Sequence, residues 1–569
     1  MLDRYSTARV AMMAAACLLA ACARSAPTPQ PVPAPQPVGQ PVEQPVLRPV
    51  EQPVLQPVQQ PPITVSPVPA PAPAATDTAR ADWHRLDYDT DSVPGTGSER
   101  ALRELLANRQ PQREVIVAVI DGGVDTAHTY LRTRLWKNAR ELPGNARDDD
   151  RNGYADDVWG WNYLVTPAGA AVNAETFEVT RLQAACQGGA AGRGIPRPSA
   201  ARCDSVASAY ADKAEEVTGT LGQIRSIERM IAQVNAALEP AVGTPLTRAK
   251  VQTYAAASEA LEQAKRIWLQ LDADGLGAEA IADAKKAYES QAKYGLDTAW
   301  FPRALTGKGS PDVTGPDASH GTHVAGIIGA ERNAAHAVMG IAPNVRLMAL
   351  RAVPDGDERD EDVARAIRYA VDNGAQVINM SFGKAFSPHK AAVDSAVRYA
   401  ESKGVLLVHA AGNDGENNDV VPSYPTPMLG GTTRANLWLE VGASSWKGPA
   451  QLVTSFSNYG KRMVDLFAPG ESILSTVPGG GVKREDGTSM AAPVVSGVAA
   501  LLLAYFPKLT PADVRDIILT SVRTFPEAQV PLPGGVGQQV PFASLSRTGG
   551  LVDAYAAVKL ALQRESLRP

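Results

Sequence analysis

The chain has 569 residues and a formal net charge of −5 at neutral pH. That length allows more than one domain and a large apolar core. The charge is slightly acidic and the sequence contains no basic run. Both features argue against a nucleic-acid-binding protein, so we expect no nucleic-acid partner.

Residues 1–21 are predicted to be a signal peptide. Two arginines precede an apolar run over 10–21, which is too short to cross a bilayer as a mature helix. The run closes with the letters LAAC, ending at Cys22. These letters resemble a bacterial lipobox, in which the cysteine becomes the lipidated first residue of the mature protein. The alternative is an ordinary small-residue cleavage site that has a cysteine beside it.

Lipidation of Cys22 predicts an exported protein that is attached to the cell envelope through its N-terminal lipid. Ala23, rather than an aspartate, follows this cysteine. By resemblance to the lipoproteins of Gram-negative bacteria, that residue points to the outer membrane. Whether the protein faces the periplasm or the cell surface stays open.

Residues 22–76 form a predicted linker built from Gln-Pro-Val units, with a proline at every fourth residue over 37–61. Such a sequence cannot bury a core and favours extended polyproline II. We interpret it as a spacer that holds a folded domain away from a membrane, and a proline-rich binding motif is the alternative. Residues 77–112 follow as a short segment with a loop and one helix over 99–107.

Apolar strands and amphipathic helices alternate over 113–165 and 310–569, which predicts an α/β fold with a doubly wound, mostly parallel sheet and helices on both faces. Asp121 closes the first strand, at the sheet edge where such folds place catalytic groups. A turn aspartate is the alternative. The strands are expected over 115–120, 345–350, 377–380 and 405–410, and the helices over 361–373, 390–403 and 551–562.

An acidic run over 148–157 is a candidate calcium site. Its oxygen-bearing side chains alternate like those in the first half of an EF-hand loop, although position 12 is Trp159 rather than glutamate. A solvated acidic turn is the alternative. The candidate ligands are Asp148, Asp150, Asn152 and Asp156.

Residues 170–305 are predicted to be a helical insertion in the α/β domain. Apolar side chains recur every three or four residues over 221–238 and over 261–271. This spacing indicates two or three antiparallel helices, which cap a cleft or merely pack beside it. Cys186 and Cys203 lie at the entry to the insertion. In an oxidising compartment they would form a disulfide worth about 3 kcal/mol, with two free thiols as the alternative.

The stretch GTSMAAP over 487–493 places Ser489 before an apolar run, where unpaired helix N–H groups can stabilise negative charge. Taken alone, such a serine is more often a helix N-cap. However, Asp121, His320 and Ser489 stand in that order within the blocks VAVIDGGVD, HGTHVAG and GTSMAAP. In these blocks and their order the chain resembles the subtilisin-like serine peptidases, the subtilases of peptidase family S8.

The resemblance implies a serine endopeptidase that hydrolyses peptide bonds in protein or peptide substrates through an acyl-enzyme intermediate. Ser489 would attack the scissile carbonyl, His320 would act as base and then acid, and Asp121 would orient the imidazole. Asn413, in the letters AAGND, matches the asparagine that donates to the oxyanion.

The stretch Ser381, Phe382 and Gly383 matches the segment that pairs with the substrate backbone in this family. No charged residue in that stretch or in the neighbouring wall over 409–413 indicates selection of a charged side chain. We therefore expect an apolar preference.

By the same resemblance the chemistry requires no cofactor, and the only metal we expect is a structural calcium ion. Tyr130 replaces an aspartate that often ligates calcium in relatives, so 148–157 remains the candidate site. Residues 77–112 are too short for the inhibitory prodomain that is usual in this family, so we expect no such prodomain. We also expect the protein to be a monomer. Two other functions stay open: a catalytically silent scaffold that uses the insertion to bind partners, and a self-processing maturase.

Overall fold

The computed structural model describes residues 79–273, 275–301, 309–333 and 335–567. All of these residues fall in one compact unit of the chain. The predicted signal peptide, Cys22 and the proline-rich linker lie outside the described residues.

A nine-stranded sheet forms the centre of the described part of the chain, with the strand order β12-β15-β9-β8-β5-β4-β1-β3-β2. Neighbouring strands are parallel except for the antiparallel pair β12 and β15. The predicted α/β fold with a mostly parallel sheet is confirmed. The strands are β1 (Val115–Asp121), β2 (Gly160–Asn162), β3 (Val345–Arg351), β4 (Val377–Met380), β5 (Leu406–Ala410), β8 (Trp438–Ser444), β9 (Leu466–Pro469), β12 (Arg523–Thr524) and β15 (Gly550–Leu551).

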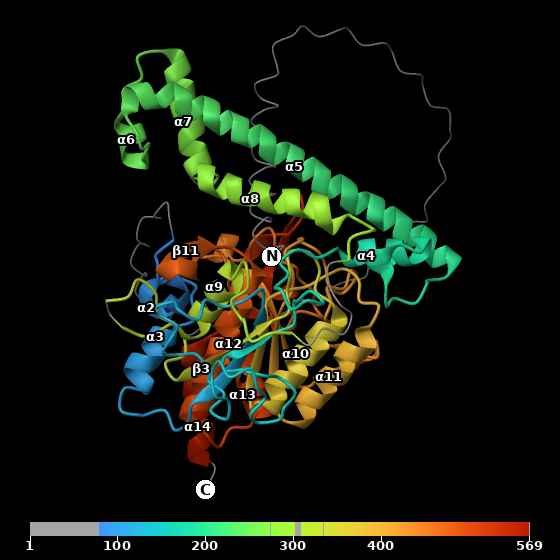
Figure 1. Cartoon of the computed structure of the whole chain (residues 1–569). Coiled ribbons are helices and arrows are strands. Elements are labelled where there is room, and N and C mark those ends of the chain that lie inside the picture. Colours follow the sequence, from blue (N-terminus) through green and yellow to red (C-terminus); the bar gives the residue numbers. More distant parts are fainter. Residues whose placement is uncertain (1–78, 274, 302–308, 334, 568–569) are drawn as a thin grey trace, which may run out of the picture. The chain divides into compact units, whose positions relative to one another are not determined.

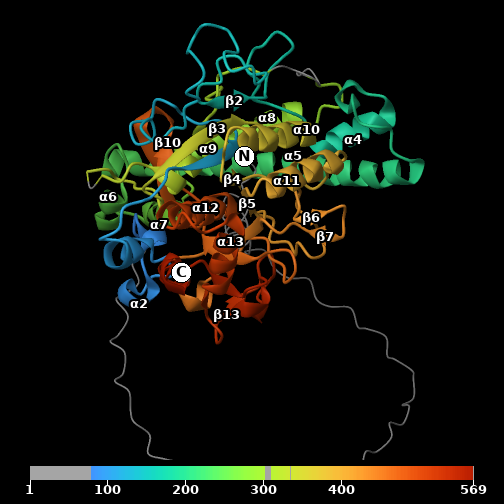
Figure 2. The same ribbon diagram turned by 90° about the horizontal axis from the view of Figure 1, so that it is seen from below.

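Helices cover both faces of the sheet, because alternate residues of its strands point to opposite sides. In β1, Ala118 and Ile120 join the apolar core that contains α10 and α11, whereas Val117 and Val119 join the core that contains α9 and α12. Figure 2 shows α10 and α11 on one side of β4 and β5, and α12 and α13 on the other. The helices are α9 (Ser319–Gly329), α10 (Asp360–Asp372), α11 (Lys390–Ser402), α12 (Thr488–Tyr505), α13 (Pro511–Thr520) and α14 (Ala554–Leu567).

Helix α12 is the central helix of the larger core. Among the described residues, it is the one helix whose length and apolar composition would allow it to cross a membrane, and its apolar window is entirely buried inside the protein. Small residues such as Gly497, whose Cα lies close to Ile341, let neighbouring elements approach it. The apolar composition of α12 therefore reflects core packing.

The segment before β1 packs against this core. It contains η2 (Trp83–Arg85), α2 (Tyr88–Asp91), α3 (Ser98–Arg100) and η3 (Ala101–Leu105), the last two covering most of the helix expected over 99–107. Trp83 is buried and donates its indole N–H to the carbonyl oxygen of Glu471 at 3.0 Å.

The insertion between β2 and α9 contains more helices than the sequence predicts. Its longest helix, α5, has an apolar face that packs with α7 and α8 in a core of its own. Figure 1 shows α5 and α8 side by side above the sheet. The periodic residues over 221–238 all belong to α5, which ends shortly after Pro240. The helices are α4 (Glu178–Gln187), α5 (Ala200–Val242), α6 (Arg248–Thr253), α7 (Glu259–Ala273) and α8 (Ala278–Ser290).

A disulfide joins Cys186 to Cys203 in the structure, with the two Cα atoms 5.8 Å apart. Cys186 lies in the last turn of α4, and Cys203 lies in the first turn of α5. The crosslink therefore fixes the connection between these two helices.

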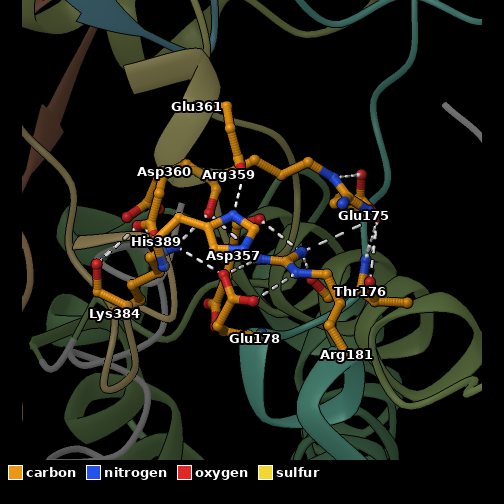
Figure 3. Close-up of polar contacts among 12 residues, drawn as sticks. Glu175, Thr176, Glu178, Arg181, Asp357, Arg359, Asp360, Glu361, Lys384 and His389 are labelled. Carbon is orange, nitrogen blue, oxygen red and sulfur yellow. Dashed lines mark hydrogen bonds and ion pairs between the residues drawn. The ribbon is translucent and has the colours of Figure 1, made fainter. Parts of the chain in front are cut away.

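The first turn of α4 is attached to the segment after β3 by buried polar contacts, which Figure 3 shows. Arg181 donates to Glu178 Oε2 at 2.6 Å. The same guanidinium donates to the backbone oxygens of Asp357 and Glu358, at 3.1 and 3.2 Å. The Asp357 carboxylate in turn accepts the backbone N–H of Glu178 at 2.8 Å. The start of α4 and this segment therefore hold each other in place.

Lys384 joins the segment after β4 to the same cluster. Its ammonium nitrogen lies 2.7 Å from Glu178 Oε2 and 2.9 Å from Asp360 Oδ1. It also donates to the carbonyl oxygen of Glu358 at 2.8 Å. These three partners match the three N–H bonds of an ammonium group, so the buried cation is fully satisfied.

Negative charge exceeds positive charge in this buried cluster. For Glu178, Arg181 and Lys384 outweigh the effect of burial and lower the pKa to about 2. For Glu358, burial dominates, Lys384 offsets only part of it, and the pKa rises to about 7. The imbalance is therefore strongest at Glu358. The cluster contains five carboxylates, those of Glu175, Glu178, Asp357, Glu358 and Asp360, and three cations, those of Arg181, Arg359 and Lys384.

Replacement of Glu358 by glutamine is expected to stabilise the protein above pH 7 and not below pH 4.5. The folded protein keeps a proton on this carboxyl up to a pKa of about 7, whereas the ordinary pKa is 4.5. Between these values the folded state binds more protons than the unfolded state, so wild-type stability falls as the pH rises. The Glu358→Gln variant lacks this titration, and its advantage grows across the window, up to roughly 3 kcal/mol.

Thermal melts of both proteins at pH values on either side of this window measure the effect. Glu215→Gln is the matched control, because Glu215 is exposed on α5 and lies outside the cluster. An advantage that is equal at every pH would contradict the assignment of the proton to Glu358.

Candidate active site

Asp121 and His320 meet at the carboxyl edge of the sheet. Asp121 is the last residue of β1, and His320 is the second residue of α9. His320 Nδ1 lies 2.8 Å from Asp121 Oδ1 and 3.0 Å from Oδ2. His320 is 6% exposed and Asp121 is 1% exposed. A carboxylate beside Nδ1 favours the proton on that nitrogen, so Nε2 is the basic nitrogen of the ring.

Glycine at position 321 lets α9 approach β1 this closely. A Cβ atom there would stand 2.2 Å from the carbonyl oxygen of Gly123 and 3.0 Å from the Cβ of Asp121. Backbone atoms cannot yield to such a contact. The glycine of the HGTH letters therefore serves the close approach of acid and base.

Ser489 is the second residue of α12 and is fully buried. Gly487 occupies the N-cap position of this helix, so the alternative of Ser489 as the N-cap is wrong. The Ser489 hydroxyl donates to the carbonyl oxygen of Ser381 at 3.1 Å, and the Ser381 hydroxyl donates to the carbonyl oxygen of Ser489 at 2.9 Å. This reciprocal pair fixes the serine against the segment after β4. At the start of this helix the Met490 N–H donates to the carbonyl oxygen of Gly487 at 3.1 Å, and the first N–H groups of any helix have no acceptor in the regular i−4 pattern.

Asn413 follows β5 and lies beside the start of α12. Its Oδ1 accepts the backbone N–H of Thr488 at 2.8 Å and the Thr488 hydroxyl at 3.0 Å. Because the side-chain oxygen accepts both bonds, the Nδ2 donors of Asn413 point away from Thr488. Asn413 and Ser489 line the same cavity, so the predicted oxyanion donor and the predicted nucleophile face one space.

The cavity beside Ser489 has a volume of about 480 Å³. Phe382 and Gly383, two of the three residues predicted to pair with substrate, line it, while Ser381 contacts Ser489. The insertion forms another part of its wall and does not merely pack on the domain. Helix α5 contributes Ala209, Asp212, Lys213 and Glu216, and α8 contributes Tyr288.

Glu358 and Lys384 also line this cavity, and sequence reasoning missed both. Their contact crosses 26 residues of chain, and each gains its partners only through folding. One signal was present in the letters PDGDERDED over 354–362, a dense group of charges directly after an apolar strand. That position is at the sheet edge where α/β proteins form their sites.

His323, the second histidine of the HGTH letters, has a structural environment. It is buried, and its Nε2 lies 3.0 Å from the carbonyl oxygens of both Ile473 and Lys483. Burial lowers its pKa, so the ring is neutral near pH 7. It holds the hairpin of β10 (Ile473–Val477) and β11 (Gly481–Glu485) against α9.

The structure gathers two of the four predicted calcium ligands. Asp148 and Asp150 place carboxylate oxygens within 4.8 Å of each other and of an oxygen of Glu141, which was not predicted. Carboxylates are ligands that suit Ca²⁺. Asp156 points elsewhere, since its carboxylate accepts three backbone N–H groups at 2.7 to 3.2 Å. The Asn152 side-chain oxygen accepts a backbone N–H at 2.8 Å.

The chain is similar in sequence to several known serine proteases. The thermophilic serine proteinase of Bacillus sp. strain AK1 is 43% identical over 185 residues, which are 32% of this chain and 42% of that protein. The cell wall-associated protease of Bacillus subtilis is 38% identical over 36% of this chain and only 21% of its own length. Subtilisin of Bacillus pumilus is 38% identical over 212 residues, which are 36% of this chain and 72% of the subtilisin.

Among solved structures, the protease domain of PatA is 32% identical to this chain, with a TM-score of 0.35. The match covers 43% of this chain and 82% of the PatA domain. Residues 112–537, which include Asp121, His320, Asn413 and Ser489, match the subtilase family, peptidase S8. The chain therefore belongs to the subtilase family.

Proposed function

We propose that the protein is a serine endopeptidase that cleaves peptide bonds through Asp121, His320 and Ser489. The observation that carries the proposal is the buried Asp121–His320 pair at 2.8 Å. It lies at the same sheet edge as the cavity that Ser489 and Asn413 line. All four residues come from one chain, so we propose the monomer as the active unit.

The geometry supports a two-step mechanism. Ser489 Oγ attacks the peptide carbonyl carbon while its proton moves to His320 Nε2, and Asp121 stabilises the imidazolium that forms. The oxyanion receives N–H groups from Asn413 Nδ2 and from the first turn of α12. The imidazolium then protonates the leaving amine, and water hydrolyses the resulting acyl-enzyme by the reverse sequence. Protein groups supply every proton transfer, so the chemistry requires no cofactor.

The segment of Ser381, Phe382 and Gly383 is proposed to bind the substrate backbone. Two of these residues line the cavity, and the third contacts the nucleophile through its carbonyl oxygen. A peptide laid along this segment would have its carbonyl group near Ser489.

Ser489→Ala is expected to abolish peptidase activity and labelling by a fluorophosphonate probe, because no other group can form the acyl-enzyme. Asn413→Ala is expected to keep the labelling site but to lower kcat about 10²- to 10³-fold, a known value for loss of such a donor in subtilisin that we take over rather than derive. Casein hydrolysis and gel-based labelling measure both variants. Undiminished hydrolysis by the Ser489→Ala variant would contradict the proposal.

We further propose that the protein is exported and anchored to the cell envelope, at the outer membrane, through lipidated Cys22. The LAAC letters before the proline-rich linker support this. One relative, a cell wall-associated protease, is compatible with export.

Cys22→Ser is expected to move the protein from the membrane fraction to the soluble fraction, because the lipid supplies the attachment. Fractionation followed by detergent phase separation measures this, with Cys17→Ser as the control, since Cys17 lies inside the predicted signal peptide. A Cys22→Ser protein that still sediments with membranes would require another anchor.

A structural calcium ion is proposed between Glu141, Asp148 and Asp150, whose oxygens lie close together. Chelator is expected to lower the melting temperature of the wild type, and to have no further effect on Asp148→Ala or Asp150→Ala. Asp149→Asn is the control, because Asp149 lies between the two but outside the group. If both alanine variants respond to chelator like the wild type, any calcium site is elsewhere.

A further inference from the structure

The cavity beside Ser489 has a lining with an excess of acidic groups. They come from the insertion, from the segment after β3 and from the loop after β5, so three separate parts of the chain contribute them. The lysines in the lining come from α5 and from the segment after β4. The acidic residues are Asp212, Glu216, Asp357, Glu358, Asp414 and Glu416, and the lysines are Lys213 and Lys384.

Both lysines are already engaged. Lys384 has its three partners in the buried cluster. Lys213 lies 2.9 Å from Glu216 Oε1, and its ammonium stands 4.9 Å from the centre of the Phe177 ring. The cavity therefore has little positive charge left to offer an anionic ligand.

Glu358 is in the opposite situation. It is 2% exposed, and its Oε1 has no hydrogen-bond partner among the described residues. Arg181 and Lys384 both reach this residue, but they donate hydrogen bonds to its backbone oxygen. A buried carboxylate oxygen without a partner is costly unless a cation or a donor reaches it. The excess of negative charge in the buried cluster thus coincides with an unpartnered carboxyl oxygen on the cavity wall.

The other lining residues suit the aliphatic part of a long basic side chain. Phe177, Val179, Tyr288 and Phe382 are all buried residues that line the cavity. Lysine and arginine carry apolar methylene stems that pack on such surfaces while the charged head reaches a polar partner. An acidic end and apolar walls together describe a site for one basic side chain.

We propose that the cavity beside Ser489 selects peptides that carry a lysine or arginine side chain, and that Glu358 is the residue that binds the cationic head. This inference rests on the proposed peptidase function and names its substrate class. The proposed preference for basic side chains replaces the apolar preference expected from the sequence. That expectation rested on residues 381–383 and 409–413, and Glu358 lies outside both stretches. Glu358 acts here as a specificity-determining residue.

Peptide binding to the full-length Ser489→Ala protein tests the proposal without cleavage. Fluorescein-labelled hexapeptides carry lysine, norleucine or Nε-acetyl-lysine at one position, with each of the six positions examined in turn by fluorescence anisotropy. At one or more positions the lysine peptide is expected to bind roughly 10- to 100-fold more tightly than both uncharged analogues, the range for a hydrogen bond to a charged group. Acetylation keeps the stem but removes the charge, so it isolates the ionic contribution.

Adding Glu358→Gln to the Ser489→Ala protein is expected to abolish this preference, whereas adding the exposed Glu215→Gln leaves it unchanged. Equal binding of the three peptides at every position overturns the proposal, as does a preference that survives Glu358→Gln. The first comparison needs no change at position 358, so it tests the preference for basic side chains even if that variant folds poorly.

Cleavage by the wild type separates this inference from the proposed function. A lysine preference in binding, combined with no Ser489-dependent cleavage, overturns the peptidase proposal and leaves the cation site standing. Ser489-dependent cleavage without any preference for basic side chains overturns the cation site alone.

Discussion

The order of strands in the parallel sheet is the constraint on which the site depends. Because β4 lies between β1 and β5, the carboxyl ends of these three strands are neighbours. Asp121 at the end of β1, Ser381 after β4 and Asn413 after β5 therefore share one edge, although nearly three hundred residues separate the first from the last. Helix α12 packs on the same strands and brings Ser489 to that edge. A different strand order would separate the acid and base from the helix that carries the serine.

The insertion is joined to the α/β domain through a cluster of buried charges. Moving ions out of water is costly, and replacing a buried ion pair by apolar groups is often neutral or stabilising. Hydrogen bonds and ion pairs are directional, and those of Arg181 and Lys384 join α4 to the segments after β3 and β4. Both segments line the cavity. We therefore interpret the cluster as a device that sets the shape and charge of that cavity, since the helices of the insertion already have an apolar core of their own.

Much of the fold followed from local patterns, because uninterrupted apolar strands and periodic helices carry their own signal. The strand expected over 115–120 appears as Val115–Asp121, and the helix expected over 390–403 appears as Lys390–Ser402. The last helix begins later than expected, at Ala554, because Gly550–Leu551 pair as a strand. Asp121 and His320, which the family resemblance pairs as acid and base, are in contact in the structure. In contrast, the direction of the Asp156 side chain depends on a turn twelve residues away, and the surroundings of Glu358 depend on partners from α4 and from the segment after β4. Such long-range contacts leave no periodic trace in a single sequence.

The unpartnered oxygen of Glu358 links occupancy of the cavity to the lifetime of the folded protein. A cation that binds there binds the folded chain and not the unfolded one, so it shifts the folding equilibrium toward the folded state by mass action. A chain engaged with substrate then opens less often, and transiently opened chains are the ones that proteases cut. For a proteolytic enzyme this amounts to protection from self-digestion while substrate is abundant, and to a shorter working life once it is consumed.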